Sequence, residues 1–295
     1  MEEENKNASA LPKKKRHFIL AVFVIAVALT LVGQLAGALI MLPFKIMADG
    51  ADDSIQFLFM YLEFIGIDIL VLLYCAVFEK EIFRSFLGAG RGGGRGNRFR
   101  SIGFGLLIGF AMNGICILAA WLHGDLRFSV GDFRLIYLIC ALLSVFVQSC
   151  AEELVTRGYM MGALKARYRG WIAIVGNALF FGLFHLLNTG ITVVSFLEIV
   201  GIGLALSLVV YYFESIWMAA AIHTSWNFTQ NFLFGLPNSG FVSKGSFLHL
   251  EAASDSILYD TVFGVEGAIP ALIVTAVLAA AVIVYARKKT PKSDF

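Results

Sequence analysis

Charged residues are scarce in this sequence of 295 residues. They make up 15% of the chain, whereas a typical soluble domain has about 25%. Hydrophobic residues reach 59%, and the mean hydropathy is +0.80. This shortage of charge excludes an ordinary soluble enzyme. The net charge of +2 is too small to indicate a nucleic-acid partner.

Disulfide and common zinc-binding patterns are also missing. The four Cys all lie in apolar stretches without CxxC spacing, and the chain contains no HExxH. We therefore expect free, packed thiols and no disulfide framework. The first apolar stretch is too long for a removable signal peptide, and it lacks a small-residue cleavage site.

Long apolar stretches are what the sequence has in place of these patterns. Each is close to the length of about 20 residues that a helix needs to cross a bilayer. We predict an all-α polytopic membrane helical bundle of eight transmembrane helices with an intramembrane active site. The expected spans are residues 17–44, 55–78, 102–122, 135–156, 171–187, 191–213, 215–232 and 268–286.

The basic residues predict the orientation of this bundle. Of the 23 Lys and Arg, all but Lys45, Arg127, Arg134 and Lys244 fall on one side of the predicted membrane. Cytoplasmic segments carry the excess of Lys and Arg, so we predict cytoplasmic termini and an outside loop over 233–267. The size and the compact loops suit an integral protein of a bacterial inner membrane.

A glycine-rich segment at 88–97 resembles an RGG tract. A single short copy between two spans is more simply a flexible linker near anionic headgroups. We therefore expect membrane lipids as partners and no nucleic acid.

Ionisable side chains at bilayer depth cost about 2.5–3.5 kcal/mol each on insertion scales, which makes them candidate functional residues. They concentrate in the second half of the chain. Glu198 could hydrogen-bond in neutral form inside the bundle or line a cavity, and Glu63 and Asp68 receive no role. The clustered polar residues are Glu152, Glu153, Arg157, His185, Glu198, His223 and Asn227.

The spacing of the first group separates its two carboxylates. Glu153 and Arg157 are four residues apart, with the acid first, which favours a helical ion pair. Glu152 points about 100° away and has no partner in this pair. The two acids could also do no more than mark a helix end at the headgroups.

Two further pairs show the same spacing of four residues, Phe181 with His185 and His223 with Asn227. Each pair occupies one stripe of its helix, although a single His on such a stripe can be an ordinary core residue.

A hairpin turning at 168–170 would place Glu152 and His185 at the same depth, roughly 24–26 Å from the turn. His223 would lie about 13 Å into its own span. We predict that these side chains and Asn227 meet in one cavity in the inner half of the bilayer.

The three motifs together, Glu152-Glu153-x-x-x-Arg157, Phe181-x-x-x-His185 and His223-x-x-x-Asn227, resemble the CPBP family of intramembrane proteases. This family includes the type II CAAX prenyl endopeptidases, related to the Ras-converting enzyme, and bacterial relatives linked to bacteriocin processing and self-immunity. The resemblance covers about residues 135–232.

The resemblance implies an intramembrane endopeptidase in which Glu152 polarises a water that His185 helps to hold. His223 and Asn227 would stabilise the oxyanion, and Glu153, Arg157 and Phe181 would orient the site. Peptide hydrolysis does require a general base and donors aimed at the developing oxyanion. The implied substrate is a membrane-associated, prenylated or leader peptide.

Names in this family often include the word metalloprotease, and Glu152, His185 and His223 could bind Zn²⁺. Asn is a poor zinc ligand, and the usual zinc spacings are missing. We favour hydrolysis without a metal or other cofactor, with zinc as the alternative.

Two other functions remain possible from the sequence. One is a noncatalytic immunity or scaffold protein of the same fold, and the other is a proton-coupled transporter. A transporter commonly shows a duplication of its two halves, and we find none. The predicted organisation is 1–134 for the tail and first three helices, 135–232 for the catalytic core, and 233–295 for the outside loop, last helix and tail.

Overall fold

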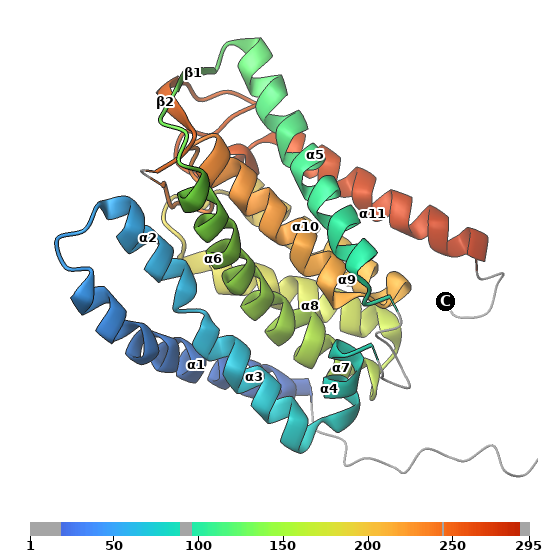
Figure 1. The fold of residues 1–295 in the computed structure, drawn as a ribbon. Coiled ribbons are helices and arrows are strands. Elements are labelled where there is room, and N and C mark those ends of the chain that lie inside the picture. The colour runs from blue at the N-terminus through green and yellow to red at the C-terminus, as the bar shows by residue number, and fades with distance from the viewer. Residues whose placement is uncertain (1–18, 89–95, 244, 290–295) are drawn as a thin grey trace, which may run out of the picture.

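The computed structural model describes residues 19–88, 96–243 and 245–289. It is a bundle of long helices with a small sheet at one end (Figure 1). The N-terminal half contains α1 (Ile19–Met47), α2 (Asp53–Leu62), α3 (Ile65–Phe78), α4 (Lys80–Phe86), α5 (Phe99–His123), β1 (Leu126–Val130) and α6 (Leu135–Glu153). The C-terminal half contains α7 (Met161–Lys165), α8 (Gly170–Phe184), α9 (Val193–Phe213), α10 (Ile216–Phe228), β2 (Leu248–Ala253) and α11 (Ile269–Lys289).

The predicted polytopic helical membrane protein is confirmed, with one difference in the number of spans. Seven helical segments in the described chain are long and apolar enough to cross a membrane, where eight were expected. The remaining one, predicted at 215–232, is α10, which has 13 residues and continues into a π-helical turn at Thr229–Leu233. Helix α10 packs between α5 and α6, so protein surrounds it. A helix in these surroundings can carry polar side chains that a lipid-facing helix could not.

The helix bundle has two ends that differ in structure (Figure 1). Helix α1 begins and α11 ends at the end of the bundle where α4 and α7 lie, whereas β1 and β2 lie at the opposite end. The first and last described helices therefore have their outer ends on one side, as predicted. Which side is cytoplasmic stays a prediction. Most of the glycine-rich segment 88–97 and the basic residues of the N-terminal tail lie outside the described residues.

The segment after α10 is more than an outside loop. Its strand β2 pairs with β1 in an antiparallel two-stranded sheet, a β element that the all-α prediction did not contain. Its side chains Leu236, Tyr259, Phe263 and Val265 are fully buried. This segment is too short for an independent core, so it buries its apolar side chains against the end of the bundle.

Helices α1 and α3 approach closely through glycines. A Cβ added to Gly66 would lie 2.3 Å from the carbonyl oxygen of Gly33 and 2.3 Å from the backbone nitrogen of Gly37. Only glycine permits this backbone contact. It fixes the position of α1, which also packs against the helices after α5 through Val22 and Ala26. The division of the chain into three sections stays a prediction.

Candidate active site

A cavity of about 480 Å³ lies inside the bundle. Residues of α1, α2, α3, α6, α8, α9, α10 and the 234–268 segment line it. Its wall includes all four predicted catalytic side chains and Phe181. The polar residues on the wall, apart from hydroxyl side chains, are Gln34, Gln148, Glu152, His185, Asn188, Glu198, His223, Asn227, Asn238 and Glu266.

Directly behind this wall lies the predicted ion pair. Arg157 Nη1 is 2.9 Å from Glu153 Oε1, and neither side chain has exposed surface. The guanidinium also donates to the carbonyl oxygen of Gly203 at 3.1 Å and lies over the ring of Phe181, 4.3 Å from its centroid. Arg157 sits on a π-helical turn, Leu154–Met160, that directly follows Glu153. Such turns are frequent at functional sites.

Glu152 lies on the cavity wall with its two oxygens in different surroundings. Gln148, one turn earlier on α6, donates from Nε2 to Glu152 Oε1 at 2.6 Å. The other oxygen, Oε2, is buried and has no hydrogen-bond partner. From the sequence we expected no partner for Glu152 on its own helix, and this expectation was wrong because Gln148 is such a partner. The four-residue spacing that identified Glu153 and Arg157 also relates Gln148 to Glu152 and could have revealed it.

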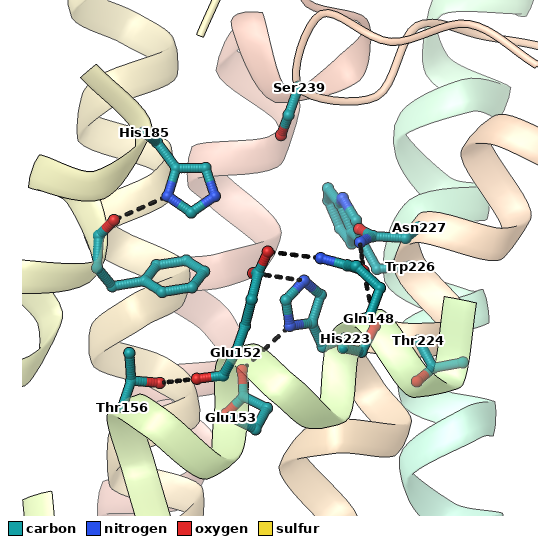
Figure 2. A network of polar contacts seen from close by, with 12 residues as sticks. Gln148, Glu152, Glu153, Thr156, His185, His223, Thr224, Trp226, Asn227 and Ser239 are labelled. Carbon is teal, nitrogen blue, oxygen red and sulfur yellow. Dashed lines mark hydrogen bonds and ion pairs between the residues drawn. The ribbon is translucent and has the colours of Figure 1, made fainter. Parts of the chain in front are cut away.

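His223 on α10 connects the two carboxylates (Figure 2). Its Nδ1 is 3.1 Å from Glu153 Oε1, and its Nε2 is 3.7 Å from Glu152 Oε2. The carboxylate of Glu153 accepts, so Nδ1 carries a hydrogen and Nε2 faces Glu152. The two acids point in different directions from their own helix, and a side chain of another helix reaches both.

His185 stands where α8 ends, and its ring faces the same space as Glu152 (Figure 2). Its Nδ1 is 2.8 Å from the carbonyl oxygen of Phe181. A carbonyl can only accept, so Nδ1 donates and Nε2 is the nitrogen left for a ligand. The Phe181 ring packs against the rings of both His185 and His223. The pair predicted on one helical stripe is thus in direct contact.

Asn227, one turn after His223 on α10, completes the predicted set. It donates from Nδ2 to Gln148 Oε1 at 3.2 Å, and its Oδ1 accepts from Asn238 Nδ2 at 3.2 Å. Asn238, Ser239 and Glu266 come from the 234–268 segment and were not anticipated. No regular spacing in the sequence relates them to the motifs.

The remaining intramembrane acids have separate surroundings. Glu198 accepts from Thr275 Oγ1 at 3.1 Å and also lines the cavity, while its neutral form stays a prediction. Glu63 pairs with Lys45 at 2.6 Å. Asp68 is buried, its Oδ1 has no hydrogen-bond partner, and it lies off the cavity wall.

The fit of these residues to a zinc ion is poor. Within the described ranges, no three His, Cys, Asp or Glu side chains gather in an arrangement that could hold a metal ion. We therefore derive no step through a metal.

Comparison with known proteins identifies a family that part of the chain resembles. The chain has no match among curated proteins. Residues 134–229 match the family described as type II CAAX prenyl endopeptidase Rce1-like. The matched segment contains the three motifs and helices α6, α8, α9 and α10, and it supplies seven of the ten polar residues named above for the cavity wall. Membership of this family implies an intramembrane endopeptidase acting on peptide or protein substrates. Residues 134–229 of this membrane protein thus form a domain similar to the Rce1-like type II CAAX prenyl endopeptidases, a family of peptidases.

Proposed function

We propose that the chain hydrolyses a peptide bond inside the bundle with Glu152 as the general base. One observation carries this proposal. Glu152 Oε2 is buried on the cavity wall without a hydrogen-bond partner, while Oε1 is held by Gln148. A buried carboxylate oxygen without a partner is costly, and a water would satisfy it. A water at this position could lose its proton to Oε2 as it attacks a carbonyl carbon.

Two neighbours favour the same water position. His223 Nε2 faces Glu152 Oε2 at 3.7 Å, and His185 presents Nε2 from the opposite wall. We assign to His185 a share in holding the water. The resulting tetrahedral oxyanion requires donors, and Asn227 Nδ2 has a second hydrogen beyond the one it gives to Gln148. We assign the oxyanion to Asn227 and to His223, whose Nε2 donates when the ring is protonated at both nitrogens.

Arg157, Glu153 and Phe181 support the site by positioning His185 and His223. Arg157 balances the charge of Glu153, and Glu153 in turn accepts from His223 Nδ1. These contacts fix the rotamer of His223. A fixed donor costs no reorganisation when charge develops on the substrate.

The wall of the cavity supports a proposal for the class of substrate. Most of the lining is apolar, and it includes Leu31 of α1 and Leu187 after α8, which are 63% and 95% exposed on the outside of the bundle. The cavity wall thus continues to the surface that would face lipid. We propose a membrane-associated substrate, either a prenylated protein or a leader peptide, that reaches Glu152 from the bilayer.

The test is hydrolysis of a peptide library by the purified protein in detergent. We expect Glu152→Gln to fold normally and to lower turnover by about 10²–10⁴-fold, because an amide cannot accept the proton of water. Glu63→Gln is the matched control, since Glu63 pairs with Lys45 away from the cavity wall. Its turnover should stay close to wild type.

Two results would contradict the proposal. A Glu152→Gln protein that keeps more than about a tenth of wild-type turnover would exclude Glu152 as the base. A folded wild type that cleaves no member of the library would favour the noncatalytic alternative.

A further inference from the structure

A chain of side-chain amides crosses the cavity wall between two carboxylates. It runs from Glu266, which precedes α11, through Asn238 and Asn227 to Gln148, and it ends on Glu152. The links are Asn238 Nδ2 to Glu266 Oε1 at 3.1 Å, Asn238 Nδ2 to Asn227 Oδ1 at 3.2 Å, Asn227 Nδ2 to Gln148 Oε1 at 3.2 Å and Gln148 Nε2 to Glu152 Oε1 at 2.6 Å. The three amide side chains are each at most 7% exposed.

Glu266 fixes the direction of this chain. Its four contacts are all donors: Trp226 Nε1 at 2.9 Å and Asn238 Nδ2 on Oε1, and Ser239 N at 2.9 Å and Ser239 Oγ at 2.8 Å on Oε2. The indole and backbone N–H groups can only donate, so both oxygens of Glu266 act as acceptors. Asn238 must then direct its amino group, and not its oxygen, to Glu266.

The direction passes along the chain because an amide has one donor end and one acceptor end. Both hydrogens of Asn238 Nδ2 are engaged, one with Glu266 and one with Asn227 Oδ1. Asn227 therefore presents Nδ2 to Gln148 Oε1, and Gln148 presents Nε2 to Glu152. A reversal of Asn227 would place two oxygens or two amino groups against each other at both of its contacts.

The backbone around Asn238 supports this arrangement. Asn238 and Phe241 exchange two backbone hydrogen bonds, of 2.8 and 2.9 Å, across a tight turn. Ser239 at this turn has φ of +48°, in the left-handed region that few residues other than glycine adopt. Glu266 binds both the N–H and the hydroxyl of Ser239, which stabilises the turn in this conformation.

We propose that Glu266 and Asn238 are positioning residues that fix the amide of Asn227, and through Gln148 the carboxylate of Glu152. The inference rests on the proposed function and extends it to two residues outside the matched segment 134–229. The 234–268 segment is thereby a part of the active site, since it sets which end of Asn227 faces the oxyanion.

The test compares Asn238→Asp with Asn177→Asp. An ionised acid at 238 has no hydrogen to donate, and a protonated one has a single hydrogen that the Glu266 carboxylate would accept, so Asn227 loses the contact that orients it. We expect kcat to fall by roughly ten- to a hundredfold, with KM within about twofold of wild type. Asn177 is a buried amide that donates a hydrogen bond to Ser207 and has no hydrogen bond to Asn238, Asn227 or Gln148. The same change there should lower folded yield and leave kcat of the folded protein near wild type.

A second measurement does not depend on activity. The Tm shifts of Asn238→Ala and Gln148→Ala should not add in the double variant, because Asn227 links the two side chains. The Tm shifts of Asn238→Ala and Asn177→Ala should add.

The outcomes separate the two proposals. Unchanged kcat in Asn238→Asp, in a wild type that cleaves peptides, would overturn the positioning role alone. Additive Tm shifts for positions 238 and 148 would also overturn it. If the Tm shifts for positions 238 and 148 are not additive and the wild type cleaves no peptide, the hydrogen-bonded amides are supported and the peptidase mechanism is overturned.

Discussion

At the residue scale, the balance of charge around Arg157 holds the site together. The side chain has no exposed surface, and its partner Glu153 is equally buried. Removal of one member of a buried ion pair leaves an unbalanced charge, at a cost of about 3–5 kcal/mol. Glu153 also accepts from His223, so its loss would affect a proposed catalytic side chain as well.

We predict that Glu153→Gln lowers both the folded yield and the turnover of the protein. This differs from Glu152→Gln, which should lower turnover alone. Thermal unfolding in detergent, measured beside the peptide assay, checks the difference. The matched control is Glu81→Gln, because Glu81 pairs with Arg84 on an exposed surface. A pair of this kind contributes about 0–1 kcal/mol. Equal losses of stability in Glu153→Gln and Glu152→Gln would argue against the separate roles.

A second prediction at this scale separates the oxyanion role of His223 and Asn227 from zinc binding. If Asn227 donates to the oxyanion, Asn227→Ala should lower turnover by about 10²–10³-fold with little change in substrate affinity. Chelators should then have no effect on the wild type. Metal analysis of the purified protein checks the alternative. One zinc per chain that disappears in His223→Ala together with activity would replace the general-base mechanism with a metal-dependent one.

At the element scale, the contact between α1 and α3 forms one wall of the cavity. Thr30 and Gln34 line the cavity from α1, and Phe64 and Ile67 line it from the start of α3. Because Gly66 has no Cβ, the two backbones approach so closely that a Cβ at this position would not fit between them. The position of α1 therefore depends on the absence of a Cβ atom at Gly66.

We predict that Gly66→Ala separates α1 from α3 and destabilises the protein by about 1–3 kcal/mol, the usual cost of overpacking. Activity should fall as well, because the cavity wall moves. The control is Gly114→Ala on α5, where an added Cβ meets nothing within 4 Å. Alanine favours a helix over glycine by about 1 kcal/mol, so this control should be neutral or stabilising. A normal Tm in Gly66→Ala would show that the two helices can separate without cost.

At the scale of the whole molecule, the two ends of the bundle differ in charge and in structure. Helices α4 and α7 lie at one end with the basic residues of the connecting segments, and the sheet of β1 and β2 lies at the other (Figure 1). The positive-inside rule assigns the end with α4 and α7 to the cytoplasm. The cavity's supporting segment 234–268 would then lie outside.

We predict that a cysteine at Glu251 of β2 reacts with an impermeant thiol reagent in intact cells and that one at Lys80 of α4 does not. Both positions are exposed, whereas Ser246 in the same outer segment is buried. The background should carry Cys140→Ala, because Cys140 is the native thiol with exposed surface among the four. Labelling at Lys80 and protection at Glu251 would invert the orientation.

The sequence alone was sufficient to predict the helical membrane fold and the four candidate catalytic side chains that line one cavity. Membrane spans can be predicted from local hydropathy, because a run of about 20 apolar residues is recognisable without knowing which residues pack against it. The pairs at four-residue spacing, such as Glu153 with Arg157, are equally local, since one helix determines their geometry. The same rule applied to Gln148 would have found the partner of Glu152.

Tertiary structure decided what depends on residues far apart in the chain. Helix α10 packs between α5 and α6, and for this reason it tolerates polar side chains such as those of His223 and Asn227. The contacts of His223 with two carboxylates of another helix follow from the packing of α10 on α6. Asn238 and Glu266 reach Asn227 only because the 234–268 segment buries its apolar side chains on the bundle. Such contacts have no periodic signal, since the spacing along the chain places no limit on which side chains a folded segment brings together.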